Sequence, residues 1–165
     1  MVDTASQRLL DRLLREADRT MAEVMYCWVV TPAEDGVGAH ARAVKDQKDG
    51  TVADPWTRWF LARRQSRKVA ELRRAGRATL AYQHASGEAY VALAGRAELI
   101  DDRAAVESRF RPANDYEAAM LPQLLAVRVS GDHLELHIRG VTAEPWGHGR
   151  TLLDRDADGS WRLAE

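Results

Sequence analysis

The chain has 165 residues, a length that suits one domain with its own hydrophobic core. Its 24 Lys and Arg residues almost balance its 25 Asp and Glu residues, so no global charge favours nucleic acid or membrane. Cys27 is the only cysteine and lies in an apolar run, which excludes an intramolecular disulfide and a cysteine metal cluster. No signal-peptide pattern and no apolar run near ~20 residues is present, so we expect a soluble, cytoplasmic single domain over residues 1–165.

The first half of the chain predicts an amphipathic helix, three strands and a second helix. Leucines at helical spacing indicate a helix over residues 4–22. Alternating or continuous apolar runs then predict strands at 24–31, 39–45 and 59–62, with a turn at 32–38 that contains Asp35-Gly36. The second helix is expected from about Arg67 to Ala75, ended by Gly76.

The second half predicts mostly strands. Strands at 78–83 and 88–100 pair across a short turn, and Gly95 marks a bulge or a close backbone approach. A short helix at 102–110 and a loop at 111–122 with one helical turn follow. The remaining segments predict two hairpins: 125–130 with 133–138 around Gly131-Asp132, and 151–155 with 160–163.

Most of these strands follow one another without a crossover helix. This order favours a closed or half-closed antiparallel barrel with peripheral helices over a βαβ sheet. No internal repeat or linker divides the chain.

The strongest functional signal is the start of the second helix. Ser66 is a good N-cap residue, and Arg67 and Lys68 fall in the first helical turn, where cations oppose the helix dipole. This arrangement indicates an anion held by the two side chains, the Ser66 hydroxyl and the free backbone N–H groups. The alternative is a basic, solvated helix face, because Arg73, Arg74 and Arg77 follow.

A second cation lies on a strand that precedes this helix. Arg42 is flanked by Ala41 and Ala43, whose small side chains leave room for a flat ligand. Together with Ser66, Arg67 and Lys68, Arg42 could hold one dianionic phosphate monoester. The alternative is an ordinary strand arginine that faces solvent.

These segments resemble the FMN-binding pattern of the pyridoxamine 5′-phosphate oxidase-like split barrels, and the short general-stress-protein branch is the most similar in length. The resemblance rests on Arg42-Ala43-Val44, Trp59-Phe60-Leu61-Ala62 and Ser66-Arg67-Lys68-Val69. It continues through 78–82 and 91–98 and through the tail with Trp146, so it extends from about residue 24 to the end.

The resemblance implies a six-stranded antiparallel split β-barrel that forms a homodimer, with FMN at the subunit interface. It implies that four residues hold the FMN phosphate and ribityl chain: Arg42, Ser66, Arg67 and Lys68. The segment around Ala43 would belong to the same site. Leu61 and Ala62 would approach the cofactor mainly through their backbone, and Trp146 would approach from the other subunit. No catalytic acid or base is identified.

The chain differs from the family pattern at several positions, and we therefore do not expect it to oxidise pyridoxamine phosphate. The family's C-terminal Arg-x-His-Asp-Arg run, which binds pyridoxal phosphate, is here Thr151-Leu152-Leu153-Asp154-Arg155. Tyr90 stands where the family often has a glutamine, and Leu61-Ala62 replaces a tyrosine-threonine pair.

Two metal patterns carry less weight. Asp154-x-Asp156-x-Asp158-Gly159 followed by Glu165 satisfies the EF-hand formula. However, Trp161 occupies the position usually given to a small aliphatic residue, and Pro145, Gly147 and Gly149 argue against a long entry helix, so we interpret the pattern as a polar hairpin turn. His133 and His137 share a strand face but lie ~13 Å apart, too far to bind one metal. We therefore expect no metal site.

We expect a flavin-dependent oxidoreductase that acts on an unidentified small molecule. Three alternatives stay open: a flavin-binding stress or sensing protein without turnover, a deazaflavin (F420)-dependent reductase, and a nucleic-acid-binding barrel that uses the basic residues of 58–77. The balanced overall charge argues against nucleic acid as a partner.

Overall fold

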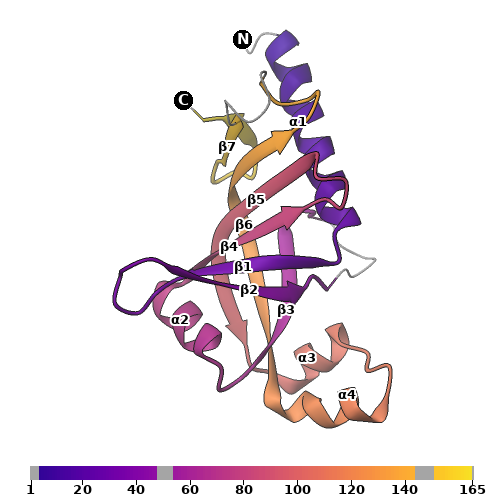
Figure 1. Ribbon diagram of the computed structural model, residues 1–165, viewed down its shortest axis with the longest axis vertical. Coiled ribbons are helices and arrows are strands. Elements are labelled where there is room, and N and C mark those ends of the chain that lie inside the picture. The colour runs from indigo at the N-terminus through magenta and orange to yellow at the C-terminus, as the bar shows by residue number, and fades with distance from the viewer. Residues whose placement is uncertain (1–3, 48–53, 144–150, 165) are drawn as a thin grey trace.

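The computed structural model describes residues 4–47, 54–143 and 151–164, which form one antiparallel sheet and four α-helices (Figure 1). The strands are β1 (Tyr26–Pro32), β2 (Ala39–Lys45), β3 (Thr57–Arg63), β4 (Arg77–Gln83), β5 (Ala89–Ile100), β6 (Leu124–Ile138), β7 (Thr151–Arg155) and β8 (Trp161–Leu163). The helices are α1 (Thr4–Glu23), α2 (Arg67–Ala75), α3 (Arg103–Arg109) and α4 (Asp115–Met120), and a 3-10 turn, η1 (Leu121–Gln123), precedes β6.

The sheet curls into a barrel that stays open along one line. Its strand order is β2-β1-β4-β5-β6-β7-β8, and β3 pairs with the first half of β6. Within the described residues, β2 has a ladder only with β1 and β3 only with β6, so the edges of β2 and β3 are not zipped together. One backbone bond joins them at one end, from Gln47 N to Trp59 O at 2.8 Å. The fold is therefore a split β-barrel, as expected.

The structure has more strands than the six that we expected for the barrel. The two additional strands, β7 and β8, form the predicted C-terminal hairpin and extend the sheet from the second half of β6. The six barrel strands β1–β6 thus agree with the expectation, and the sheet as a whole is larger.

The hairpin predicted around Gly131-Asp132 is wrong, because β6 runs through these residues as one continuous strand. On β5, Ala94 lies opposite His133 and Gly95 lies opposite Gly131, so Asp132 is one extra residue on β6. Such a β-bulge shifts the alternation of buried residues by one position, as a tight turn also would. Gly131 does not have the positive φ that the predicted two-residue turn would need.

The close approach predicted at Gly95 is confirmed at this bulge. A Cβ atom on Gly95 would lie 2.0 Å from the carbonyl oxygen of Ser130, inside any allowed contact. A Cβ on Gly131 would lie 2.3 Å from Leu93 Cδ1. Both glycines let β5 and β6 cross closely where the barrel wall bends.

The helices begin and end near the predicted residues. α2 begins after Ser66 and ends at Gly76, whose φ of 65° is the left-handed conformation typical of a helix C-terminus. The predicted loop at 111–122 contains the short helix α4, capped by the Asn114 side chain. Of the described helices, none is long and apolar enough to cross a membrane.

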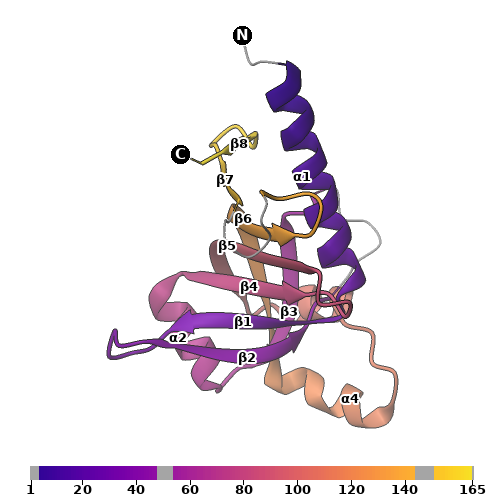
Figure 2. The same cartoon turned by 45° about the horizontal axis from the view of Figure 1, so that its top comes forward.

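The core fills the barrel and continues under α1, which packs Leu13, Ala17 and Met21 against it. Figures 1 and 2 show α1 and the β7–β8 hairpin at the end of the molecule that carries both termini, and α4 at the opposite end. α2 lies beside the β1–β2 hairpin in both views. Cys27 is buried, as its apolar surroundings predict.

A buried ion pair lies near the bond that joins β2 to β3. Arg58 of β3 donates from Nε to Asp46 Oδ2 at 3.1 Å and pairs with the same oxygen through Nη2. The Tyr82 hydroxyl, on β4, donates to this oxygen at 3.2 Å. Burial raises the pKa of Tyr82 well above its usual value, so the phenol stays a neutral donor. This cluster therefore joins the residue that follows β2 to β3 and β4, at the end where the split is closed.

Candidate functional site

The candidate site lies where β2 and β3 separate and α2 covers the opening. α2 follows β3 directly, and Arg74 anchors it to the β1–β2 hairpin by donating to the carbonyl oxygens of Pro32 and Glu34. Because β2 and β3 have no partner strand on their facing edges within the described residues, backbone groups on these edges are not committed to a ladder. The opening therefore offers both backbone donors and the N-terminus of a helix.

The first turn of α2 has the geometry of an anion site. Ser66 is the N-cap, and its Oγ accepts the N–H of Val69 at 3.3 Å. The hydroxyl proton of Ser66 is not used by that bond. The first N–H groups of a helix have no partner within it, and they point along the positive end of the dipole. An anion at this end of α2 would meet several donors at once.

Glu71, one turn further along α2, is the centre of a buried polar cluster. Its Oε2 accepts the hydroxyl of Thr31 at 2.6 Å and Nη2 of Arg42 at 2.8 Å. Its Oε1 lies 2.6 Å from Nδ1 of His40 and 3.6 Å from Nε of Arg67. We call these five residues the Glu71 cluster. The carboxylate thus joins α2 to both β1 and β2.

The Glu71 carboxylate stays ionised although its side chain has no exposed surface. Burial by itself raises its pKa, but the hydrogen bonds from Thr31, Arg42 and His40 outweigh burial and lower the pKa to about 2. Two of the side chains that shield the carboxylate from solvent are themselves partly exposed, Arg67 by 65% and His40 by 35%. Water close to the cluster therefore screens part of its electrostatic energy.

Lys68 is the cation in the site without an anionic partner among the described residues. Its ammonium lies 5.6 Å from the centre of the Phe60 ring, and its side chain is partly buried. Desolvation, and then the charge of Arg42, lower the pKa of Lys68. Both causes penalise the positive charge, and the attraction of a bound anion would offset that penalty.

The charges of the site suit a dianion. Arg42, Arg67 and Lys68 contribute three positive charges and Glu71 one negative charge, which leaves two positive charges around the start of α2. A phosphate monoester carries close to two negative charges at neutral pH. The donor set and its net charge therefore fit the phosphate of FMN.

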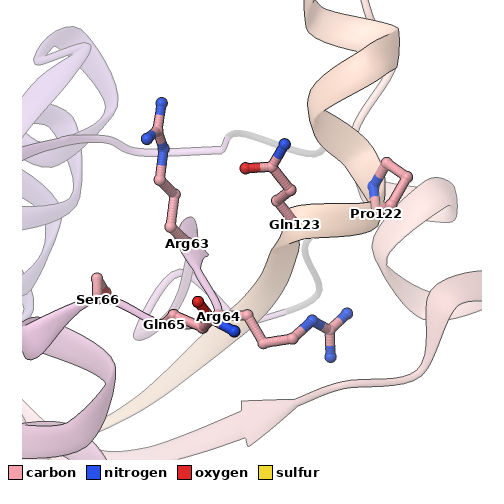
Figure 3. Close-up of a pocket in the computed structure, with 6 residues that line it drawn as sticks. All are labelled: Arg63, Arg64, Gln65, Ser66, Pro122 and Gln123. Atoms are coloured by element: carbon pink, nitrogen blue, oxygen red, sulfur yellow. The ribbon is translucent and has the colours of Figure 1, made fainter.

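A cavity of about 470 Å³ lies next to this turn (Figure 3). It opens between the β3–α2 connection and the start of β6 and is lined by Arg63, Arg64, Gln65, Ser66, Pro122 and Gln123. Figure 3 shows the side chains of Arg63 and Gln123 pointing the same way, while Arg64 points elsewhere. Ser66 is the one predicted site residue that lines it, so the cavity and the cations Arg42 and Lys68 flank the α2 turn separately.

The other residues of the predicted site have mixed positions. Leu61 and Ala62 lie on β3 opposite Ala126 and Leu125 of β6, and the Ala62 side chain is buried. Ala43 is exposed and points to the face of β2 opposite to Arg42, as strand alternation requires. Ala43 could therefore contact a ligand beside Arg42 only through its backbone. Trp146 lies outside the described residues.

The alternative interpretation of this segment is a basic, solvated helix face. In the structure, several of its basic side chains pair with different acidic residues. Arg64 pairs with Asp101, Arg67 with Glu71, and Arg77 with both carboxylate oxygens of Asp132. Arg58 is buried against Asp46. These side chains point to different neighbours and do not form one continuous cationic stripe.

The turn interpretation of the EF-hand pattern agrees with the structure. Residues 156–160 connect β7 to β8, and the carboxylates among them have protein partners: Arg162 for Asp156 and Ser160 for Asp158. His133 pairs with Asp154 at 2.7 Å. Across the described ranges, no group of three or more metal-binding side chains gathers; Glu165 lies outside them.

Sequence reasoning missed Glu71, although one signal was present. Glu71 is the only acidic residue in the run from Arg63 to Arg77, which contains seven cations. Its position four residues after Arg67 indicates an ion pair on the helix. Its contacts with Thr31, His40 and Arg42 could not be inferred, because they depend on how α2 docks on β1 and β2.

The open sheet places this chain in the class of split β-barrel proteins. Residues 15–121 match the family described as "Pyridoxamine 5'-phosphate oxidase like". The chain belongs to this family. A comparison with curated proteins found no matching relative.

Solved structures share the fold at low sequence identity. A Clostridium acetobutylicum protein related to general stress protein 26 of B. subtilis (pyridoxinephosphate oxidase family) has a TM-score of 0.70 and 17% identity, covering 87% of this chain and 95% of that one. A pyridoxamine 5′-phosphate oxidase-related, FMN-binding protein from Nostoc punctiforme has a TM-score of 0.61 and 14% identity, covering 100% and 99%. A structure named F420 reductase has a TM-score of 0.56 and 14% identity, covering 71% and 94%.

Proposed function

We propose that this chain is a homodimeric, cytoplasmic flavoprotein that binds FMN and acts as an oxidoreductase. Arg42, Arg67 and Lys68 hold the phosphate, with the Ser66 hydroxyl and the first N–H groups of α2. The observation that carries the proposal is Lys68, a partly buried cation beside Arg42 with no acidic partner among the described residues. FMN binding by the structurally similar Nostoc punctiforme protein supports it.

The protein's own residues would bind and orient the cofactor. The cations provide affinity for the phosphate, and the unpaired edges of β2 and β3 supply backbone donors and acceptors for a flat polar ring. When bound, the flavin supplies hydride and single-electron transfer. Because the cations lie at the helix start, they act on the phosphate end of the cofactor.

The substrate differs from pyridoxamine phosphate in this proposal. The tail lacks the leading arginine and the histidine of the oxidase run, and its remaining arginine is already engaged. Arg155 donates to Asp54 at 3.0 Å and to the carbonyl oxygen of Gly159 at 3.0 Å. Asp154 pairs with His133 and Arg162. These bonds support a structural role for the run.

A second copy of the chain would cover the exposed apolar surface at the start of β1. Met25, Tyr26 and Trp28 are each more than half exposed, and a shallow depression of about 200 Å³ beside Trp28 has a mostly apolar lining that includes Ala81 and Tyr90. Apolar surface of this kind marks interfaces more often than free surface. Light scattering during gel filtration measures the subunit number, and a monomer would contradict this part of the proposal.

A deazaflavin is the second candidate cofactor, because the F420 reductase structure has the same fold. The charge of the site favours FMN. The tail phosphate of F420 is a diester with one charge, whereas the FMN phosphate is a monoester whose two charges match the net charge of the site.

The test is a flavin titration of freshly purified protein. We expect a flavin spectrum, or saturable uptake of FMN that Lys68→Ala or Arg42→Ala weakens about tenfold or more, as loss of a charge-assisted bond predicts. Arg73→Ala is the matched control, because Arg73 is an exposed arginine in the last turn of α2, away from the start of the helix. If neither Lys68→Ala nor Arg42→Ala changes the uptake of FMN, the proposed site is wrong. Preferential uptake of F420 would favour the deazaflavin.

Turnover is tested separately, on the flavin-loaded protein. Reduction by NADH or NADPH followed by reoxidation with a small acceptor would support an oxidoreductase. A flavin that is reduced but not reoxidised by any small acceptor would favour the flavin-binding or sensing protein without turnover.

A further inference from the structure

Arg42 is held on one side only. Nη1 donates to the Thr31 hydroxyl oxygen at 3.1 Å and Nη2 donates to Glu71 Oε2 at 2.8 Å. A guanidinium has five N–H groups in a planar fork, so three remain after these two bonds. The Arg42 side chain is 23% exposed, and water or a ligand can therefore reach it.

The partners of Arg42 cannot change places easily. Both oxygens of Glu71 are occupied, Oε1 by His40 and Arg67 and Oε2 by Thr31 and Arg42. If Arg42 moved away to meet a ligand, it would leave a covered carboxylate short of a partner, which is costly. Arg42 therefore stays in place, and a ligand must come to its remaining N–H groups.

Thr31 fixes the direction of this arrangement. Its hydroxyl has one proton, which it donates to Glu71 at 2.6 Å, so its oxygen is left to accept from Arg42. The triangle of Thr31, Glu71 and Arg42 has a donor and an acceptor on each side. It holds the guanidinium plane more firmly than an ion pair alone would.

We propose that Glu71, together with Thr31, is a positioning residue for phosphate recognition, which holds Arg42 so that its free N–H groups face the phosphate of the cofactor. This inference rests on the proposed function and adds residues to it that make no contact with the ligand. The opposite model is that Glu71 competes with the phosphate for Arg42 and weakens binding.

The two models predict opposite effects of Glu71→Gln. The substitution keeps the size of the side chain and removes its charge. If Glu71 positions Arg42, the dissociation constant for FMN rises about tenfold, the order expected for loss of a charge-assisted hydrogen bond. If Glu71 competes, FMN binds more tightly in the variant.

Riboflavin is the control ligand, because it has the same ring and no phosphate. Both dissociation constants are measured by quenching of flavin fluorescence for the wild type and the variant. We expect the Glu71→Gln effect on FMN and no change for riboflavin. An equal loss for both flavins would overturn the inference, since it would indicate a general structural role.

A pair of substitutions at Thr31 tests the same idea without changing a charge. Thr31→Val removes the hydroxyl at nearly constant volume, and we expect weaker FMN binding with riboflavin unchanged. Thr31→Ser restores the hydroxyl and should restore the affinity for FMN. This pair also decides the matter if urea denaturation shows that Glu71→Gln is not folded.

The failure of this inference is distinguishable from failure of the proposed function. Wild-type protein that binds no FMN would overturn both. Wild-type protein that binds FMN, with Glu71→Gln and Thr31→Val binding it equally well or better, would overturn the inference alone.

Discussion

Two buried carboxylates, Asp46 and Glu71, lie toward opposite ends of β2 and have different surroundings. Asp46 meets Arg58 and the Tyr82 hydroxyl, and the Asp46 and Arg58 side chains are 2% and 9% exposed. Glu71 is equally covered, but two of its partners reach solvent and Lys68 adds a further cation. The first cluster has balanced charge and a complete cover, whereas the second has excess positive charge and an open side.

The difference separates a structural cluster from a candidate binding site. A balanced, closed ion pair has no capacity left for a ligand, and removing one partner leaves a buried charge. A cluster with surplus cations and uncommitted donors gains from an added anion. The predictions below act on this contrast.

The largest expected effect is on stability at Asp46. Arg58→Met removes the partner of a buried carboxylate, and we expect a loss of about 3–5 kcal/mol in the free energy of unfolding, measured by urea denaturation. Arg96→Met is the control, because the Arg96 side chain is 69% exposed and should cost no more than about 0.5 kcal/mol. Equal effects of both substitutions would contradict the structural role of the pair.

The next effect is on binding at Lys68. Lys68→Met keeps an apolar contact with Phe60 and removes the charge. We expect the dissociation constant for FMN to rise about tenfold or more. The free energy of unfolding without ligand should stay equal or rise, because the substitution removes a desolvated charge beside Arg42. A loss of stability without loss of affinity would reverse the assignment of Lys68.

A third prediction concerns acid and the Glu71 cluster. The folded-state pKa of Glu71 is about 2, below its ordinary value of 4.5, because its hydrogen bonds outweigh the effect of burial. The ionised carboxylate therefore stabilises the fold fully above about pH 4.5, and this stabilisation is lost as the pH falls toward 2. The stability difference between wild type and Glu71→Gln should be constant at neutral pH and shrink over this window. A difference that is independent of pH would contradict the prediction.

The smallest effect concerns the reactivity of Cys27 near the Asp46 pair. Burial, and then the charge of Asp46, raise the pKa of the Cys27 thiol to about 11. Little thiolate is present at pH 8, so a disulfide reagent such as Ellman's should label the native protein slowly. Labelling should speed up in Arg58→Met, as the cover opens. Fast labelling of the wild type would show that this cluster is not closed.

The local elements could be predicted because their causes are local. The hydroxyl of Ser66 caps the start of α2 by accepting the N–H of Val69, three residues further along the chain. Gly76 ends the helix with a backbone conformation that glycine adopts without strain. The alternation at 39–45 gives β2 the predicted bounds. Each of these signals acts within a few residues of its own position.

The failed hairpin at Gly131 shows where local pattern is ambiguous. A one-residue shift in alternation is produced equally by a turn and by a bulge, and only the pairing of β6 with β5 decides between them. Gly131 lies against Leu93, a residue far away in sequence, and a Cβ at this position would force the Leu93 side chain to move. The close contact at Gly95 could be predicted, although its partner Ser130 could not.

The sequence alone determined the succession of strands along the chain, the caps of α2 and the basic residues at its start, because each depends on neighbouring residues. The class of protein followed from the resemblance of these segments to a known family. Only the tertiary structure decided how the site is arranged. Glu71 meets Arg42 across 29 residues and Thr31 across 40, and these contacts exist because α2 docks on the β1–β2 hairpin. Glu71 is therefore at the centre of the candidate site because of how α2 packs against the β1–β2 hairpin, and local sequence preference does not determine that position.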